Sequence, residues 1–131
     1  MTHPNEDLVR KGFAAFSSGD MATLDGLFAD DIVWHSAGNN QLSGDARGKA
    51  AVMDLFKRTF ELTGGTFKIE IHDVLANDTH GVALVHATAD HEGRKLDDDT
   101  VQVFHIADGK VTEQWLCPGN QAASDAFWGQ A

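Results

Sequence analysis

His35 is the residue of this sequence with the clearest capacity for acid–base chemistry. It follows a short run of β-branched and aromatic residues, Ile32–Trp34, and precedes a stretch rich in glycine and asparagine. Because a histidine side chain titrates near neutral pH, it is the usual general base of an enzyme. His35 is therefore a candidate catalytic residue. The alternative is a histidine packed on a sheet face, with a ring nitrogen bonded to a backbone carbonyl.

Three further polar residues occupy positions that could face a ligand. Gln102 and Gln114 alternate with outward-facing neighbours on predicted strands, and their amides can orient a carbonyl or hydroxyl group without titrating. Asp98 shares the parity of Gln102 and lies within the acidic run Asp97–Asp99. It could place a carboxylate at the mouth of a pocket, although such a run is typical of a hydrated strand edge.

Trp34 and His35 are adjacent, so a regular strand sends their side chains to opposite faces. We expect Trp34 on the inner face, where its ring would form an apolar wall and its indole N–H would donate to a ligand. A β-bulge between Ser36 and Gly38 would instead turn His35 inward, since glycine-rich strand ends favour bulges.

The elements that position these side chains follow from apolar spacing and turn residues. Helical spacing predicts helices that carry Leu8–Phe16, Leu24–Phe28, Lys49–Leu62 and Ala122–Trp128. Alternation and turn signals predict strands within residues 32–36, 67–71, 82–91, 100–106 and 110–117. Residues 37–48 are expected to form a long loop.

Helices followed by hairpin-linked strands define an α+β domain. We expect residues 1–131 to form one domain, in which a cone-shaped, curved antiparallel sheet wraps around the N-terminal helices. Such a cone leaves a pocket at its mouth. The residues expected to line this ligand pocket are Trp34, Ser36, Phe13, Phe16, Leu55, Phe56, Val85, Ala87, Gln102, Phe104, Gln114 and Leu116.

Four segments occur in an order and spacing that are informative together. They are Gly12–Asp20, Leu27–His35, Gly48–Phe56 and Asp108–Trp115. The set resembles the SnoaL-like polyketide cyclases and the ketosteroid isomerases, which belong to the nuclear-transport-factor-2-like superfamily. The resemblance implies a cone-shaped α+β barrel, usually a homodimer, with a mostly apolar cavity.

The resemblance also locates the acid–base positions of these enzymes, and this sequence departs from them. The places of the isomerase tyrosine, base and acidic donor hold Gly12, Ser36 and Gln102. The place of the cyclase aspartate holds Leu116, and the inward position before it holds Gln114. We expect a protein that binds a small apolar or aromatic molecule. It is either an isomerase, cyclase or dehydratase acting through an enol or enolate, or a non-catalytic binding or dimerisation module.

The outward face of the predicted sheet carries His86, Val103, His105 and Trp115. This face is too apolar and aromatic for a solvated surface, so we expect a homodimer packed through it. The histidines lack the spacing of known metal motifs, and no glycine-rich phosphate loop is present. No metal and no cofactor are therefore expected.

The charge balance excludes several classes of partner. Ten Lys and Arg against twenty Asp and Glu give a net charge of −10, which repels phosphate backbones and anionic lipid. Neither nucleic acid nor a membrane is an expected partner. The single cysteine, Cys117, excludes an internal disulfide, and neither a membrane-spanning run nor a signal peptide is visible. We therefore expect a cytoplasmic protein.

Overall fold

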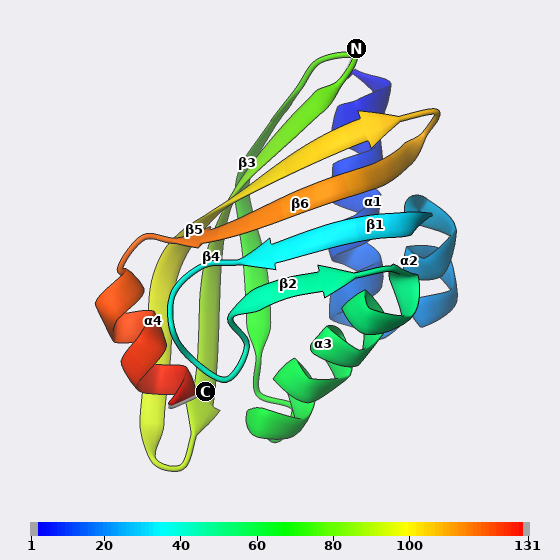
Figure 1. The fold of residues 1–131 in the computed structure, drawn as a ribbon. Coiled ribbons are helices and arrows are strands. Elements are labelled where there is room, and N and C mark those ends of the chain that lie inside the picture. The colour runs from blue at the N-terminus through cyan, green and yellow to red at the C-terminus, as the bar shows by residue number, and fades with distance from the viewer. Residues whose placement is uncertain (1–2, 130–131) are drawn as a thin grey trace.

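The computed structural model of the protein describes residues 3–129. It confirms the α+β class expected from the sequence (Figure 1). In chain order, the elements are α1 (Pro4–Ser18), α2 (Met21–Leu27), β1 (Phe28–Ser36), β2 (Gly44–Arg47), α3 (Lys49–Leu62), β3 (Lys68–Ala76), β4 (His80–His91), β5 (Arg94–Ala107), β6 (Lys110–Pro118) and α4 (Gln121–Trp128).

All the strands form one curved, unclosed sheet in the order β2-β1-β6-β5-β4-β3. Helix α1 packs on β3 and β4, and α3 packs on β1 and β2, so the helices fill the concave side of the sheet (Figure 1). The pairing register shifts between Ile71 and Asp73 and again between His105 and Ile106. Such irregularities bend a strand and increase its twist, which curves the sheet around the helices.

Two features of the sheet differ from the expectation. The stretch predicted as a loop contains strand β2, which pairs with the free edge of β1 and satisfies its backbone groups, with Trp34 opposite Ala46. The sheet is also not wholly antiparallel, because β1 runs parallel to β6, with Trp34 opposite Gln114. A parallel pair needs a long crossover connection, and the chain from β2 to β5 supplies it.

Local sequence explains where the first helices begin and end. Pro4 occupies the first turn of α1, where its missing N–H has no intrahelical partner. Gly19 ends α1 in the left-handed conformation, with φ of 75°. The carboxylate of Asp20 then caps α2 by accepting a hydrogen bond of 3.2 Å from the backbone N–H of Thr23.

The hydrophobic core lies between the sheet and the helices, and Ile32 and Val52 are completely buried in it. A smaller cluster joins Phe127 and Trp128 of α4 to Leu96 of β5 at the end of the sheet. Among residues 3–129, no helix is long and apolar enough to cross a membrane.

Candidate functional site

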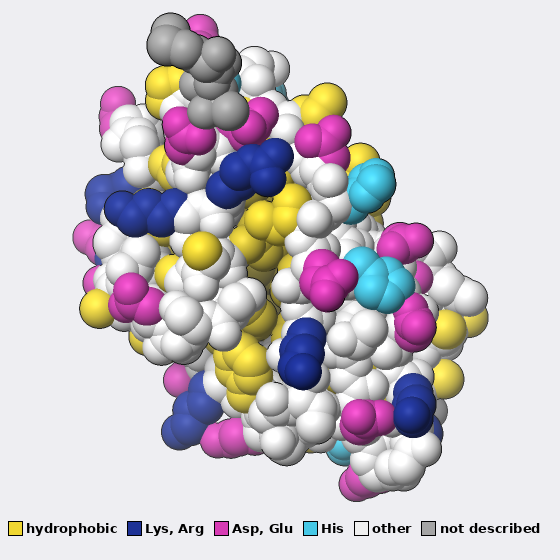
Figure 2. Space-filling view, turned by 180° about the vertical axis from the view of Figure 1, so that it is seen from behind, with side chains coloured by type: hydrophobic (Ala, Val, Ile, Leu, Met, Phe, Trp, Pro, Cys, Tyr) yellow, Lys and Arg dark blue, Asp and Glu magenta, His cyan; other side chains and the backbone are white. Residues whose placement is uncertain are grey.

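A cavity of about 120 Å³ lies between the concave side of the sheet and the helices. Its wall combines Phe13 and Phe16 of α1, Phe56 of α3 and Trp34 of β1 with side chains of β5 and β6. From the helix side, hydrophobic side chains are exposed along a groove that runs down the middle of the surface (Figure 2). An apolar cavity with few polar groups is typical of a small-molecule site.

The structure places almost all the predicted pocket residues around this cavity. They are Trp34, Ser36, Phe13, Phe16, Leu55, Phe56, Ala87, Gln102, Phe104, Gln114 and Leu116. The exception is Val85, which does not line the cavity. Its side chain faces inward as expected, but it belongs to the packed core, because α1 packs on β3 and β4 and fills that part of the sheet.

Trp34 faces the cavity and His35 does not. Trp34 is 7% exposed, and its ring meets that of Phe56 edge to face, with ring centroids 5.0 Å apart. The His35 ring stacks on Trp115 on the opposite face of the sheet, with centroids 5.1 Å apart. The pairing of β1 is regular from Val33 to Ser36, so no bulge turns His35 inward. His35 therefore cannot act as the base for a molecule inside the cavity.

Three polar atoms in the cavity wall are buried without a hydrogen-bond partner. They are Nε1 of Trp34, Oγ1 of Thr100 and Oε1 of Gln114. The amide nitrogen of Gln114 is engaged, because it donates a hydrogen bond of 2.6 Å to Oε1 of Gln102. The alternation of side chains along each strand predicted that Gln102 and Gln114 point inward. It could not predict which of their amide atoms stay unpaired, because that depends on the hydrogen bond between the two strands.

Asp98 supplies the only titratable side chain among the described residues that line the cavity. It is partly exposed, and its Oδ2 accepts a weak hydrogen bond of 3.4 Å from the backbone N–H of Asn120. The structure therefore places a carboxylate at the mouth of the cavity, beside the start of α4. Strand parity indicated this position.

The segment 37–43 is fastened to α4 beside the cavity. The Asp125 carboxylate accepts hydrogen bonds from Nδ2 of Asn40 at 2.8 Å, the backbone N–H of Asn39 at 3.0 Å and Nε2 of Gln121 at 3.0 Å. These bonds, above all the one from Asn40, hold the pKa of Asp125 below its usual value. Sequence reasoning missed this contact, because the segment reads only as a polar loop.

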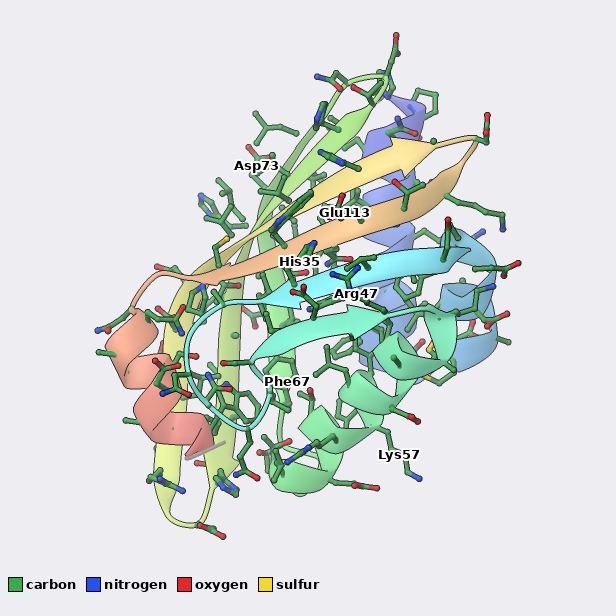
Figure 3. All side chains as sticks on the ribbon, viewed as in Figure 1. His35, Arg47, Lys57, Phe67, Asp73 and Glu113 are labelled. Carbon is green, nitrogen blue, oxygen red and sulfur yellow. The ribbon has the colours of Figure 1, made fainter. Side chains whose placement is uncertain are left out.

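The outer face of the sheet carries a second cluster, centred on His35 (Figure 3). Its Nε2 lies 2.6 Å from Oε2 of Glu113, and its Nδ1 lies 2.7 Å from Oδ1 of Asp45. His105 approaches the other oxygen of Glu113 at 3.5 Å. The hydrogen bond to Glu113, followed by that to Asp45, raises the pKa of His35, since both ring nitrogens donate only when the imidazole is charged.

The His35 ion pairs predict a pH-dependent part of the stability. A folded-state pKa above the unfolded value of about 6.5 means that these contacts stabilise the fold fully below that pH. The stabilisation is lost as the pH rises through the raised folded-state pKa of His35. We expect His35→Gln to cost about 1 kcal/mol at pH 6 and progressively less toward pH 9, measured by urea unfolding.

The control for this measurement is His72→Gln, at an exposed position on β3. Its free energy of unfolding should follow that of the unmodified protein across the same range. A His35→Gln deficit that does not change between pH 6 and pH 9 would contradict the charged-imidazole assignment.

Among residues 3–129, no group of three or more His, Cys, Asp and Glu side chains is arranged to hold a metal ion. The candidate sites are thus an apolar cavity with unpaired polar atoms and, separately, an outer cluster of histidines and carboxylates. The SnoaL-like domain pattern matches residues 9–114. The chain belongs to the SnoaL-like domain family.

The similarity of this SnoaL-like chain to other proteins extends over almost its whole length. The uncharacterized protein Rv0034 of Mycobacterium tuberculosis (strain ATCC 25618 / H37Rv) is 33% identical over 123 residues, covering 93% of this chain and 94% of Rv0034. The solved structure of Bal32a, from a soil-derived mobile gene cassette, is 36% identical with a TM-score of 0.93, covering 96% of this chain and 97% of Bal32a.

A more distant solved structure is wild-type IdmH, a putative polyketide cyclase from Streptomyces antibioticus. It is 20% identical with a TM-score of 0.76, covering 95% of this chain and 99% of IdmH, and it shows a shared fold. NTF2-like proteins are also among the structural neighbours. The resemblance to the SnoaL-like family and the NTF2-like fold is therefore confirmed.

Proposed function

We propose that this SnoaL-like protein binds a small, mainly apolar molecule with an oxygen substituent in the cavity beneath its sheet. The proposal depends above all on one observation. The indole N–H of Trp34, the hydroxyl of Thr100 and the amide oxygen of Gln114 are buried in an apolar wall without partners.

Hydrogen bonds to the unpaired atoms would contribute favourable free energy to the binding of such a ligand. A buried polar group without a partner costs about 1–3 kcal/mol, and a ligand that supplies the missing hydrogen bond removes that cost. The rest of the wall is apolar, so a ring gains further free energy by leaving water. The cavity volume of about 120 Å³ is close to that of a cavity of roughly 150 Å³ that holds benzene. The ligand class is therefore a single ring.

A reaction through an enol or enolate is supported by the carboxylate at the mouth of the cavity. Asp98 would accept a proton from the carbon next to a carbonyl, and the electron pair of that C–H bond would form a carbon–carbon double bond. The carbonyl oxygen accepts a hydrogen bond from the N–H of Trp34 and receives the proton back from Asp98. This completes the isomerisation of the ketone to its neutral enol and leaves Asp98 again as a carboxylate.

A non-catalytic binding module is the second candidate. It is supported by the family positions discussed above, because Gly12, Ser36 and Leu116 stand where related enzymes carry acid–base groups. Of the described lining residues, Asp98 alone carries an acidic or basic side chain. A binding module needs the cavity and its unpaired atoms but no proton transfer.

One experiment separates the two candidates. Cyclohexanone is titrated into the protein by calorimetry, and the exchange of its α-protons with D₂O is followed by NMR. Binding with exchange faster than in buffer supports the enzyme. Binding without such exchange favours the binding module. If neither cyclohexanone nor toluene nor phenol binds, the proposed small-molecule function is wrong.

We also propose a homodimer packed through the outer face of the sheet. Val103, His105 and Trp115 are partly exposed there in the single chain, and Val101 is an exposed large hydrophobic residue on the same face. Such a patch favours association, because burying its apolar area gains free energy. His86 lies on this face too, and its hydrogen bond to Asp99 raises its pKa.

Sedimentation velocity at micromolar concentration tests the dimer. We expect the unmodified protein to sediment as a dimer and Val103→Asp to sediment as a monomer, because a carboxylate in the interface loses its hydration. Met21→Asp, at an exposed position on α2, is the matched control and should remain dimeric. Circular dichroism checks that both variants fold. A monomeric unmodified protein would overturn the proposal.

A further inference from the structure

Trp34 and Gln114, which carry two of the unpaired atoms, are neighbouring residues in the cavity wall. The two residues are direct partners in the parallel pair of β1 and β6, so their side chains share a face of the sheet. Neighbouring strands lie about 4.8 Å apart, which a single oxygen substituent of a ligand can bridge. Gln102 lies on the next strand, β5, and its Oε1 binds the amide nitrogen of Gln114.

These two atoms have opposite hydrogen-bonding roles. The indole nitrogen of Trp34 only donates. Oε1 of Gln114 only accepts, and the NH₂ group of that residue is engaged with Gln102 at 2.6 Å. A ligand group that meets both atoms must therefore accept one hydrogen bond and donate another. A hydroxyl group does this, whereas a carbonyl oxygen leaves Gln114 unpaired and a hydrocarbon leaves both unpaired.

We propose that the cavity selects a ring bearing a hydroxyl group, such as a phenol or a stable cyclic enol, over a ketone or a hydrocarbon of the same size. This inference rests on the proposed small-molecule function and specifies its ligand class. The acceptor of Gln114 also disfavours an anionic oxygen at this position, because two negative oxygens would face each other. The site therefore holds the neutral hydroxyl form and differs from an oxyanion hole built from two donors.

The cavity dimensions and the remaining polar group are consistent with one ring and a single hydroxyl. Six ring carbons fill a volume close to that of the cavity, about 120 Å³. Thr100 contributes a hydroxyl that can donate or accept, two residues before Gln102 on the same strand and on the same face. A second oxygen substituent on the ring is therefore also compatible with the wall.

The test compares the dissociation constants of phenol, cyclohexanone and toluene by calorimetry. We expect phenol to bind roughly tenfold more tightly than either of the others, as expected for one or two net hydrogen bonds. Trp34→Phe and Gln114→Leu should each weaken phenol several-fold and leave toluene within twofold. Leu75→Met, a volume-conserving change at an exposed position on β3 that does not line the cavity, should alter none of the three.

The toluene measurement keeps the inference separate from the proposed function. If no probe binds, the small-molecule function itself is wrong. If all three bind but phenol has no advantage, or if the two variants lose toluene as well as phenol, the hydroxyl preference is wrong and the binding function remains.

The ionisation state of a bound probe gives an independent measurement. 4-Nitrophenol changes its absorption spectrum when it loses its proton, so the spectrum of the complex reports the bound form. We expect the bound probe to stay neutral to a higher pH than in buffer, and Gln114→Leu to reduce this shift. A probe bound as the phenolate would mean that the wall presents two donors to the ligand, and it would overturn the inference.

Discussion

The Ile32→Ala variant is expected to lose about 3–4 kcal/mol of unfolding free energy. Ile32 is completely buried in the main core cluster, on the same strand as Trp34. Truncating such a side chain removes its transfer free energy and leaves a void that packed neighbours fill only in part. For a protein of ordinary marginal stability, this is a large share of the total.

The matched comparison is Leu116→Ala, which removes a side chain of similar size from the cavity wall. Leu116 is partly exposed and already borders empty space, so its contacts on that side are missing in the folded state. We expect a loss of about 1 kcal/mol for this variant, a smaller cost than that of creating a new void. Both free energies of unfolding are measured by urea unfolding, with the same dependence on urea concentration (m-value) used for the two variants. Equal losses would indicate that the cavity closes in solution.

Asp98→Asn is expected to lower the rate of cyclohexanone α-proton exchange by roughly 10²- to 10⁴-fold, the usual contribution of a positioned general base. The amide keeps an oxygen that can accept from the backbone N–H of Asn120, so the local fold is retained. It cannot take up the substrate proton at neutral pH. The affinity for toluene should stay within twofold, since Asp98 lies at the mouth and not in the apolar wall.

His35→Gln is the control for this experiment. Because its ring lies on the outer face of the sheet, beside Glu113 and Asp45, the exchange rate should be unchanged. An exchange rate that falls in His35→Gln and not in Asp98→Asn would transfer the catalytic role to the outer face. Equal rates in Asp98→Asn and the unmodified protein would remove Asp98 from the reaction.

Alternation along single strands predicted the inner wall of the site. The parity of Trp34, Gln102, Gln114 and Leu116 depends only on period two within each strand, and all four line the cavity. Turn residues also marked the ends of the strands, because their effect on the backbone depends only on adjacent residues. The wall was therefore predictable from short stretches of sequence, while whether it binds a ligand stays a prediction.

Contacts between distant segments were beyond the reach of the pattern. Glu113 meets His35 from 78 positions further along the chain, and Asp125 fastens Asn40 from 85 positions away. Strand alternation correctly predicted that Val85 points inward. Its side chain lies in the packed core and not at the cavity, because α1 packs on β3 and β4 there. These contacts depend on how the helices and distant strands pack against one another, and the alternation of residues within one strand carries no information about that.

The parallel pairing of β1 with β6 also has a consequence for the order of folding. The wall that joins Trp34 to Gln114 forms only when one of the first strands meets the last. During synthesis, this part of the wall can therefore form only after the ribosome has released residues as far as Pro118, whereas β2 and Phe56 of α3 are available to Trp34 earlier. Pairings this distant in sequence slow folding, because loop-closure entropy is lost before the contacts form. The cavity wall is thus among the last parts of the protein to assemble, and until β6 emerges the inner face of β1 has only β2 and α3 to pack against.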